Sequence, residues 1–297
     1  IYKFQKHSNR GATSVLDNTG QTDKGADWNY ATQWSFHPKE LISLIYPYHF
    51  GLQNSRDLDK GAYWGYMPFT QSTHYLGLVS IIFAILGALL RKPDKTELAF
   101  WAITILTLVT GFGSHFSILY KPFYDFLPLF SKFRIPSMIY ILLAVSIPIL
   151  GSIGLDKFIN RSSDENTLRK AIYILAGIGG FTIFLLMFGK DLFGFLTVQE
   201  NVSINQNIEQ LIKQNIQRGV PEGLIRQKAE EIMRQQVQPI INARVSLFNK
   251  GLFLNILLII GLAGLIWNLF SKKINKKVFC YLLLLLSIID LWILNAE

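Results

Sequence analysis

The stretch YKPFYDFLPLFSKFRIP, residues 120–136, separates two apolar runs of the chain and decides how it is laid out. Each of its three prolines lacks an N–H and fixes φ, so we expect the chain to leave one helix and enter the next here. Lys121, Lys132 and Arg134 add positive charge to its aromatic residues. A cationic, aromatic turn at a membrane surface suits an anionic, lipid-linked ligand. It equally suits a loop that anchors helix ends among lipid headgroups.

The apolar runs on both sides belong to a strongly hydrophobic composition. The chain of 297 residues is 50% hydrophobic and 16% charged, whereas soluble domains carry about 25% charged residues. Because a spanning helix needs about 17–25 residues, the runs predict an all-α polytopic bundle of about six spans, the first at the short end. The runs lie near residues 75–90, 98–117, 137–155, 171–188, 251–270 and 278–294.

Positive charge is concentrated in three short connectors between these runs, at residues 91–95, 157–170 and 272–277. Their spacing along the chain is consistent with one side of the membrane, which the positive-inside rule identifies as the cytoplasm. The net charge of +9 then reflects these connectors and contact with anionic headgroups. No nucleic-acid module is present in the sequence, and no nucleic-acid partner is predicted.

This sidedness divides the chain into four segments. Residues 1–73 form an extracytoplasmic loop with a short amphipathic helix over 38–48. Residues 74–189 form four spans, joined by the outer turn at 120–136. Residues 190–249 carry two amphipathic helical stripes and are predicted as an extracytoplasmic helical cap, and residues 250–297 form two more spans. Because the chain begins with Ile1 and ends just after an apolar run, we expect it to be an internal piece of a longer protein.

Some residues within or beside the runs carry specific expectations. Glycines in the fourth run, such as Gly177 and Gly180, are expected to allow close helix packing. Asp290 in the last run is expected to lie at the outer interface or to pair with a partner, and Arg244 is expected to face headgroups. The five histidines show no paired ligand spacing, so no metal site is predicted.

Several short motifs follow one another in an order that resembles a known family. Their order and spacing against the apolar runs resemble bacterial YfhO-type membrane proteins, over most of the chain but only weakly at 190–248. The motifs are DWNYATQWS (27–35), EL (40–41), PYHFG (47–51), YWG (63–65), YLG (75–77), LP (127–128), FRIP (133–136) and DL (290–291).

The resemblance implies a GT-C-type glycosyltransferase of the bacterial cytoplasmic membrane. Such a protein transfers a sugar from a polyprenyl-phosphate-linked donor to a cell-envelope glycan or lipid polymer outside the membrane. In that class the catalytic carboxylate usually lies in the first outer loop, which we expect upstream of this chain. The catalytic residue is therefore unknown, and the sequence does not define a cofactor.

The reaction needs cations that neutralise the departing lipid phosphate. Arg134 and Lys132 are the candidates by position, because the guanidinium fork of arginine matches phosphate oxygens. Trp34, Glu40 and His49 are weaker candidates for contacts with the sugar or the acceptor.

Two other functions stay open at this point. A transporter or flippase of lipid-linked sugars requires polar residues along a path through the spans, and the sequence offers few of them. A non-catalytic envelope assembly protein requires no acidic residue in an upstream outer loop.

Overall fold

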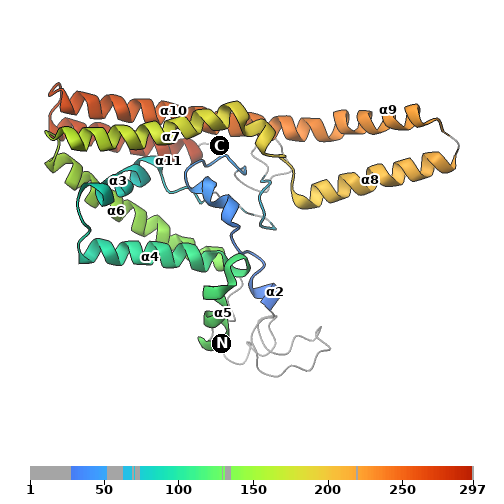
Figure 1. Cartoon of the computed structure of the whole chain (residues 1–297), viewed down its shortest axis with the longest axis horizontal. Helices are drawn as coiled ribbons and strands as arrows, with labels where there is room; N and C mark the ends of the chain where they lie inside the picture. Colours follow the sequence, from blue (N-terminus) through green and yellow to red (C-terminus); the bar gives the residue numbers. More distant parts are fainter. Residues whose placement is uncertain are drawn as a thin grey trace. The chain divides into compact units, whose positions relative to one another are not determined.

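The computed structural model describes residues 28–51, 63–68, 70, 74–128, 130, 135–218 and 220–295. Within these residues the chain is helical and contains no β-strand, which confirms the all-α prediction (Figure 1). The chain divides into two compact units. Unit 1 consists of Ile1–Leu41 and Leu76–Lys170, and unit 2 consists of Ile42–Tyr75 and Ala171–Glu297.

Unit 1 is built around a short helix packed on a longer one, with a third helix beside them. The short helix α3 and the long helix α6 have the most extensive contact, and α4 packs on α6. In chain order its elements are α2 (Trp28–Ala31), the start of the 3₁₀ helix η1 (Pro38–Leu44), α3 (Leu78–Leu90), α4 (Lys95–Gly111), η3 (Gly113–Phe116), α5 (Ser117–Phe126), η5 (Pro136–Tyr140), α6 (Ile141–Asn160) and the first turns of α7 (Glu165–Leu192).

Glycines bring the backbones of α3 and α6 together. A Cβ atom on Gly87 would lie 2.5 Å from the Cα atom of Gly154, and Gly151 also faces the backbone of α3. Small residues at such a contact are typical of helices in lipid, where packing replaces the hydrophobic driving force. Of the glycines named from the sequence, Gly177 and Gly180 have no described atom within 4 Å of a Cβ position, whereas a Cβ atom on their neighbour Gly179 would lie 3.8 Å from the Ile259 side chain of α10 (Gln238–Phe270).

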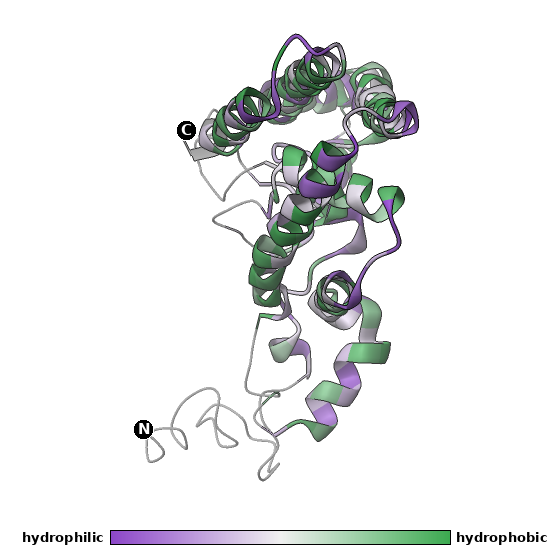
Figure 2. Ribbon diagram, turned by 90° about the vertical axis from the view of Figure 1, so that its left-hand side faces the viewer, coloured by the Kyte–Doolittle hydropathy of each residue, from purple (hydrophilic) through white to green (hydrophobic). Residues whose placement is uncertain are grey.

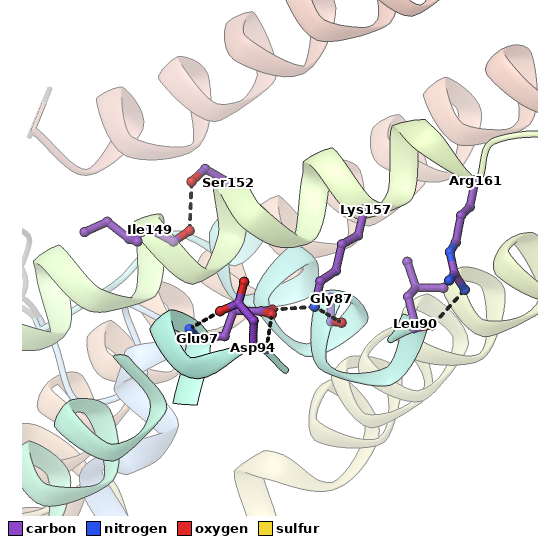
Figure 3. Close-up of polar contacts among 8 residues, drawn as sticks. All are labelled: Gly87, Leu90, Asp94, Glu97, Ile149, Ser152, Lys157 and Arg161. Atoms are coloured by element: carbon purple, nitrogen blue, oxygen red, sulfur yellow. Dashed lines mark hydrogen bonds and ion pairs between the residues drawn. The ribbon is translucent and has the colours of Figure 1, made fainter. Parts of the chain in front are cut away.

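Ionic and polar contacts hold one end of unit 1 (Figure 3). The Lys157 ammonium donates to the Glu97 carboxylate and to the Gly87 carbonyl, the latter at 3.3 Å. Arg161 donates from Nη1 to the Leu90 carbonyl at 2.9 Å. These bonds place the first two basic connectors at the same end of unit 1.

Glu97 also completes the start of α4, where it forms a capping box with Asp94. The Glu97 N–H donates to Asp94 Oδ1 at 2.9 Å, and the Asp94 N–H donates to Glu97 Oε2 at 3.0 Å. Both carboxylate oxygens of Glu97 therefore have partners, one in the cap and one in the ion pair with Lys157. This pairing explains how Glu97 can be only 3% exposed, since a buried charge is costly unless it is paired.

Fewer helices are long and apolar enough to cross a membrane than the predicted six. Three described helices meet this condition: Pro136–Asn160, Glu165–Leu192 and Gly223–Phe270. A fourth is obtained if α4 and the helical segment Gly113–Phe126, bent by 110°, count as one broken span. The chain is thus a membrane protein by helix length and composition.

For two of the missing spans the structure gives a reason. The first run forms α3, whose 13 residues rise only about 20 Å, less than the roughly 30 Å of a hydrocarbon core. The second run ends at the bend after Gly111. The sixth run forms α11 (Lys276–Asn295), which is not among the spanning candidates within the described residues.

The expectation that all three prolines of residues 120–136 break the helix was wrong for Pro122. Pro122 lies inside α5. It leaves the carbonyl of Ile118 without an intrahelical donor, but both residues are exposed, so this part of the helix is not enclosed by protein. The break comes later, at Leu127, where the backbone becomes extended.

Unit 2 contains three long helices and a helical hairpin (Figure 1). The remainder of α7 runs beside α10, and α10 packs on α11. The two helices expected between residues 190 and 249 are present, and they form an antiparallel pair that extends beyond the ends of the other helices of this unit. The antiparallel pair consists of α8 (Val198–Gln217) and α9 (Glu222–Ile232). The π-helix η6 (Met233–Val237) connects α9 to α10 (Gln238–Phe270), and α11 follows α10.

Asp290 in α11 is buried and paired. It is 4% exposed and accepts a hydrogen bond from the Tyr75 hydroxyl. Of the two expectations for this residue, pairing is the one that the structure shows.

Candidate functional site

The first candidate site is a strap of residues 34–40 that lies over the end of α4 away from the basic connectors. The Phe36 N–H donates to the Gly111 carbonyl at 2.9 Å, and the Ser137 N–H donates to the Trp34 carbonyl at 3.3 Å. The strap is thus tied by its backbone to α4 and to η5. We call residues 34–40 the unit 1 strap.

Two serines make the next connection. Ser35 Oγ accepts from the Ser114 N–H at 2.9 Å and donates to the Thr32 carbonyl at 2.6 Å. Gly113, the residue before Ser114, has a backbone φ of +49°, and a Cβ atom on it would lie 2.1 Å from Ser35 Oγ. This position needs glycine both for its left-handed backbone and for space.

Tyr140 of η5 fills the space beneath the unit 1 strap. Its hydroxyl donates to the Leu108 carbonyl at 3.1 Å, and its ring lies edge to face with Phe36, with centroids 4.8 Å apart. A Cβ atom on Gly111 would lie 2.0 Å from the Tyr140 ring. Glycine at the end of α4 is therefore what lets η5 dock.

Trp34 and Glu40, both predicted to contact sugar or acceptor, lie in this strap and are buried. Their exposures are 7% and 2%, and the Glu40 carboxyl is close enough to Tyr140 to interact with it electrostatically. A buried carboxyl group needs hydrogen-bond partners or neutralisation. In this conformation neither side chain presents a broad face to solvent, so direct contact with a sugar requires the strap to move.

A pair of histidines lies at the edge of the unit 1 strap. The rings of His37 and His115 are 4.7 Å apart in a T-shaped arrangement. Burial lowers the pKa of His37, and the neighbouring His115 and Lys39 lower it further. The Lys39 N–H donates to His37 Nδ1 at 3.1 Å, so the neutral ring carries its proton on Nε2.

That tautomer does not suit a metal ligand, since metal binding would need the protonated nitrogen. Among the described residues no group of three or more His, Cys, Asp or Glu side chains could hold a metal ion.

Aromatic residues of α5 and α2 form the outer part of unit 1. The Trp28 ring lies edge to face with Tyr124 at 5.2 Å and with Tyr120 at 5.9 Å. Lys121 Nζ lies 5.2 Å from the centroid of the Trp28 ring and 3.6 Å from Asp125 Oδ2. Trp28 therefore joins α2 to α5.

The two residues predicted to contact the donor phosphate, Lys132 and Arg134, lie outside the described residues. The description resumes at Ile135, and Pro136 is buried beside Gly113, whose Cβ position is 2.9 Å from the Pro136 ring. Among the described residues that follow, Ser137 contacts the unit 1 strap through the Trp34 carbonyl.

The third weak candidate, His49, lies in unit 2 inside a box of aromatic rings. Ring centroids lie 4.5 Å away for Phe193, 4.6 Å for Phe50, 5.1 Å for Phe248 and 6.0 Å for Trp64. His49 is 1% exposed, and neither ring nitrogen has a hydrogen-bond partner among the described residues. Burial lowers the pKa of His49 to about 3, so the ring is neutral at pH 7.

The segment that carries His49 is fastened to α10. Asn255 Nδ2 donates to the Ile45 carbonyl at 3.1 Å, and a Cβ atom on Gly251 would lie 2.9 Å from Cβ of Tyr48. We call residues 45–51 the unit 2 strap. As at Gly113 in unit 1, a glycine provides the space that the strap occupies.

Arg244 connects the base of the hairpin to α10. It donates to Glu200 from Nη1 at 2.8 Å and from Nη2 at 3.0 Å, and Nη1 also donates to the Phe195 carbonyl. Burial alone would raise the pKa of Glu200, but hydrogen bonds from Arg244 and from Thr197 lower it overall. The expectation that Arg244 faces headgroups was wrong, because its side chain is 5% exposed and paired inside the protein.

Sequence reasoning missed the contacts of Ser35 with Ser114, of His37 with His115 and of Arg244 with Glu200. Each joins residues far apart in the chain, and no motif marks the pairs. One signal was available at Thr197, because threonine followed three residues later by Glu200 is a capping box, and it marks the start of α8.

Comparison of the chain with protein-family models, with curated proteins and with solved structures gives no match.

Proposed function

We propose that this chain is part of a GT-C-type glycosyltransferase of the YfhO type. It would transfer a sugar from a polyprenyl-phosphate-linked donor to a cell-envelope polymer on the outer side of the bacterial cytoplasmic membrane. Its basic connectors would lie in the cytoplasm, and the two straps outside.

The main support is the docking of the unit 1 strap on η5. The strap carries Trp34 and Glu40, and its carbonyl at Trp34 accepts from Ser137. The segment that carries Lys132 and Arg134 runs into η5 after one further residue. The stretch predicted to contact sugar is thus bonded to η5, the helix that follows the predicted phosphate stretch in the sequence.

The proposal gives the cations an electrostatic role. When the sugar leaves, negative charge develops on the lipid phosphate, and a fixed guanidinium at Arg134 stabilises it. Lys132 adds a second charge. Glu40 is a buried group within the same strap, and we assign it to the shape of the site and not to proton transfer.

The test uses the full-length protein in proteoliposomes with a polyprenyl-phosphate-linked sugar as donor. Arg134→Ala is expected to lower kcat/KM by about tenfold to a hundredfold, which corresponds to about 1.5–3 kcal/mol for a hydrogen bond to a charged group. Arg134→Lys should recover part of the loss. The matched control is Arg91→Ala in the basic connector at the other end of unit 1, which should leave kcat/KM unchanged.

Unchanged transfer in Arg134→Ala would contradict the phosphate role. Movement of the lipid-linked sugar across the bilayer, without transfer to an acceptor, would favour the flippase alternative over the enzyme.

A further inference from the structure

The helix α5 leaves α4 at a steep angle. The helical segment Gly113–Phe126 is bent by 110° relative to α4. Figure 2 looks nearly along α4 and shows α5 from the side. A bend of 90° would place α5 parallel to the membrane when α4 crosses it, and the further 20° (110 − 90) turns α5 back toward the bilayer. With 17 residues, α4 rises about 25 Å, close to the thickness of a hydrocarbon core.

One side of α5 packs on protein. Tyr120 is 1% exposed, and its ring contacts Trp28 as well as Phe130, the latter with centroids 5.2 Å apart. The rings of Phe123 and Phe130 also lie edge to face, with centroids 5.7 Å apart. This side faces the first outer loop and the turn that follows α5.

The other side of α5 is apolar and exposed. Ile118 is 78% exposed and Phe126 is 84% exposed, and Pro122 between them is exposed as well. These three residues recur at intervals of four and so follow one another along one side of the helix. Lys121 and Asp125 form the neighbouring row and pair with each other. Apolar and charged rows side by side are typical of helices that lie in a lipid interface.

We propose that α5 is an interfacial helix that lies in the lipid leaflet opposite the connector of residues 91–95. Ile118, Pro122 and Phe126 enter the boundary between headgroups and acyl chains, and Lys121 stays at the level of the headgroups above Trp28. A lipid surface is the occupant that the geometry favours over another protein, because α5 follows the 17-residue helix α4 and the bend of 110° turns it back toward the bilayer that α4 enters.

This placement does not depend on sugar transfer. It would hold for a flippase or an assembly protein, because it follows from the bend and the exposed residues alone.

Spin labels on the full chain, reconstituted in vesicles of phosphatidylcholine and phosphatidylglycerol, test the proposal. In a Cys280→Ser background, Ile118→Cys and Phe126→Cys are labelled separately, and collisions with oxygen and with a water-soluble nickel chelate are measured. We expect both labels to be reached well by oxygen and at least tenfold less by nickel than a label at Lys92→Cys in the basic connector. Asp125→Cys should give an intermediate nickel accessibility.

Two outcomes would overturn the proposal. Nickel accessibility equal to that at Lys92→Cys would place α5 in water. Protection from both oxygen and nickel would mean that a second copy or another protein covers this side of the helix. Because the two positions are labelled independently, failure of one variant to reconstitute leaves the other to decide.

Discussion

The two straps come from the same aromatic-rich stretch of residues 34–51 but are held by different forces. The unit 1 strap is tied by backbone hydrogen bonds to Gly111 and Ser137 and by the Ser35 hydroxyl. The unit 2 strap is held mainly by rings packed around His49. The composition of the two halves does not distinguish them. What differs is the partner helix. In unit 1, α4 offers the carbonyl of Gly111 as a hydrogen-bond acceptor, and in unit 2, α10 offers the ring of Phe248.

This difference predicts where substitution is most damaging. Phe248→Ala is expected to destabilise unit 2 by about 3–5 kcal/mol, because it removes a buried ring and leaves a cavity. Phe248 is 1% exposed, and it contacts both His49 and Phe195. The loss can be measured as a shift in reversible unfolding in mixed micelles. Trp267→Ala on the same helix is the matched control, since Trp267 is 59% exposed. Equal effects of the two variants would contradict the special role of the box.

The buried imidazole gives the second prediction, a dependence of unit 2 stability on pH. The folded pKa of about 3 lies below the ordinary value of 6.5, so the unfolded chain binds more protons between these two pH values. Stability is therefore complete above pH 6.5 and falls as the pH is lowered toward 3, by about 1.4 kcal/mol per pH unit. Lowering the pH from 6.5 to 4.5 should cost about 2–3 kcal/mol in thermal unfolding.

His49→Phe is the control for this effect. It keeps an aromatic ring in the box and removes the titrating group, so its unfolding should lose most of the pH dependence in the same window. A variant that keeps the full slope would assign the titration to another group.

The smallest effect is expected in the unit 1 strap. Ser35→Ala removes the oxygen that accepts from the Ser114 N–H, which should cost about 0.5–1.5 kcal/mol and leave the aromatic box unchanged. Faster amide exchange confined to residues 34–40 and 113–116 would show this loss. Ser152→Ala is the matched control, because the Ser152 hydroxyl is exposed and bonds only within its own helix. Exchange that also rises around His49 would mean that the two straps do not respond separately.

Helical structure was predictable because it depends on local patterns. Apolar runs gave the long helices, and Pro38 correctly marked the start of η1. The number of spans was not predictable from hydrophobicity, because it depends on where a helix ends or bends, as at Leu90 and Gly111.

The candidate site was predictable only in part, for the same reason. Trp34 and Glu40 were picked out separately, in two successive motifs, and they share one strap, but their burial depends on η5, which is far away in sequence. His49 was a weak candidate from the sequence, and its aromatic surroundings come from the neighbouring Phe50, from Trp64, from the loop between α7 and α8 and from α10. Close packing at Gly87 and Gly154 also needed the partner helix to be known.

The helix Gly223–Phe270 has a consequence for how the protein meets its surroundings. Its 48 residues extend about 72 Å, whereas a hydrocarbon core is about 30 Å thick. When α10 crosses a bilayer, about 40 Å of this rod stands clear of the hydrocarbon. The hairpin of α8 and α9 then projects from the membrane surface over that length, and the ion pair between Arg244 and Glu200 ties the start of α8 to α10 at its base.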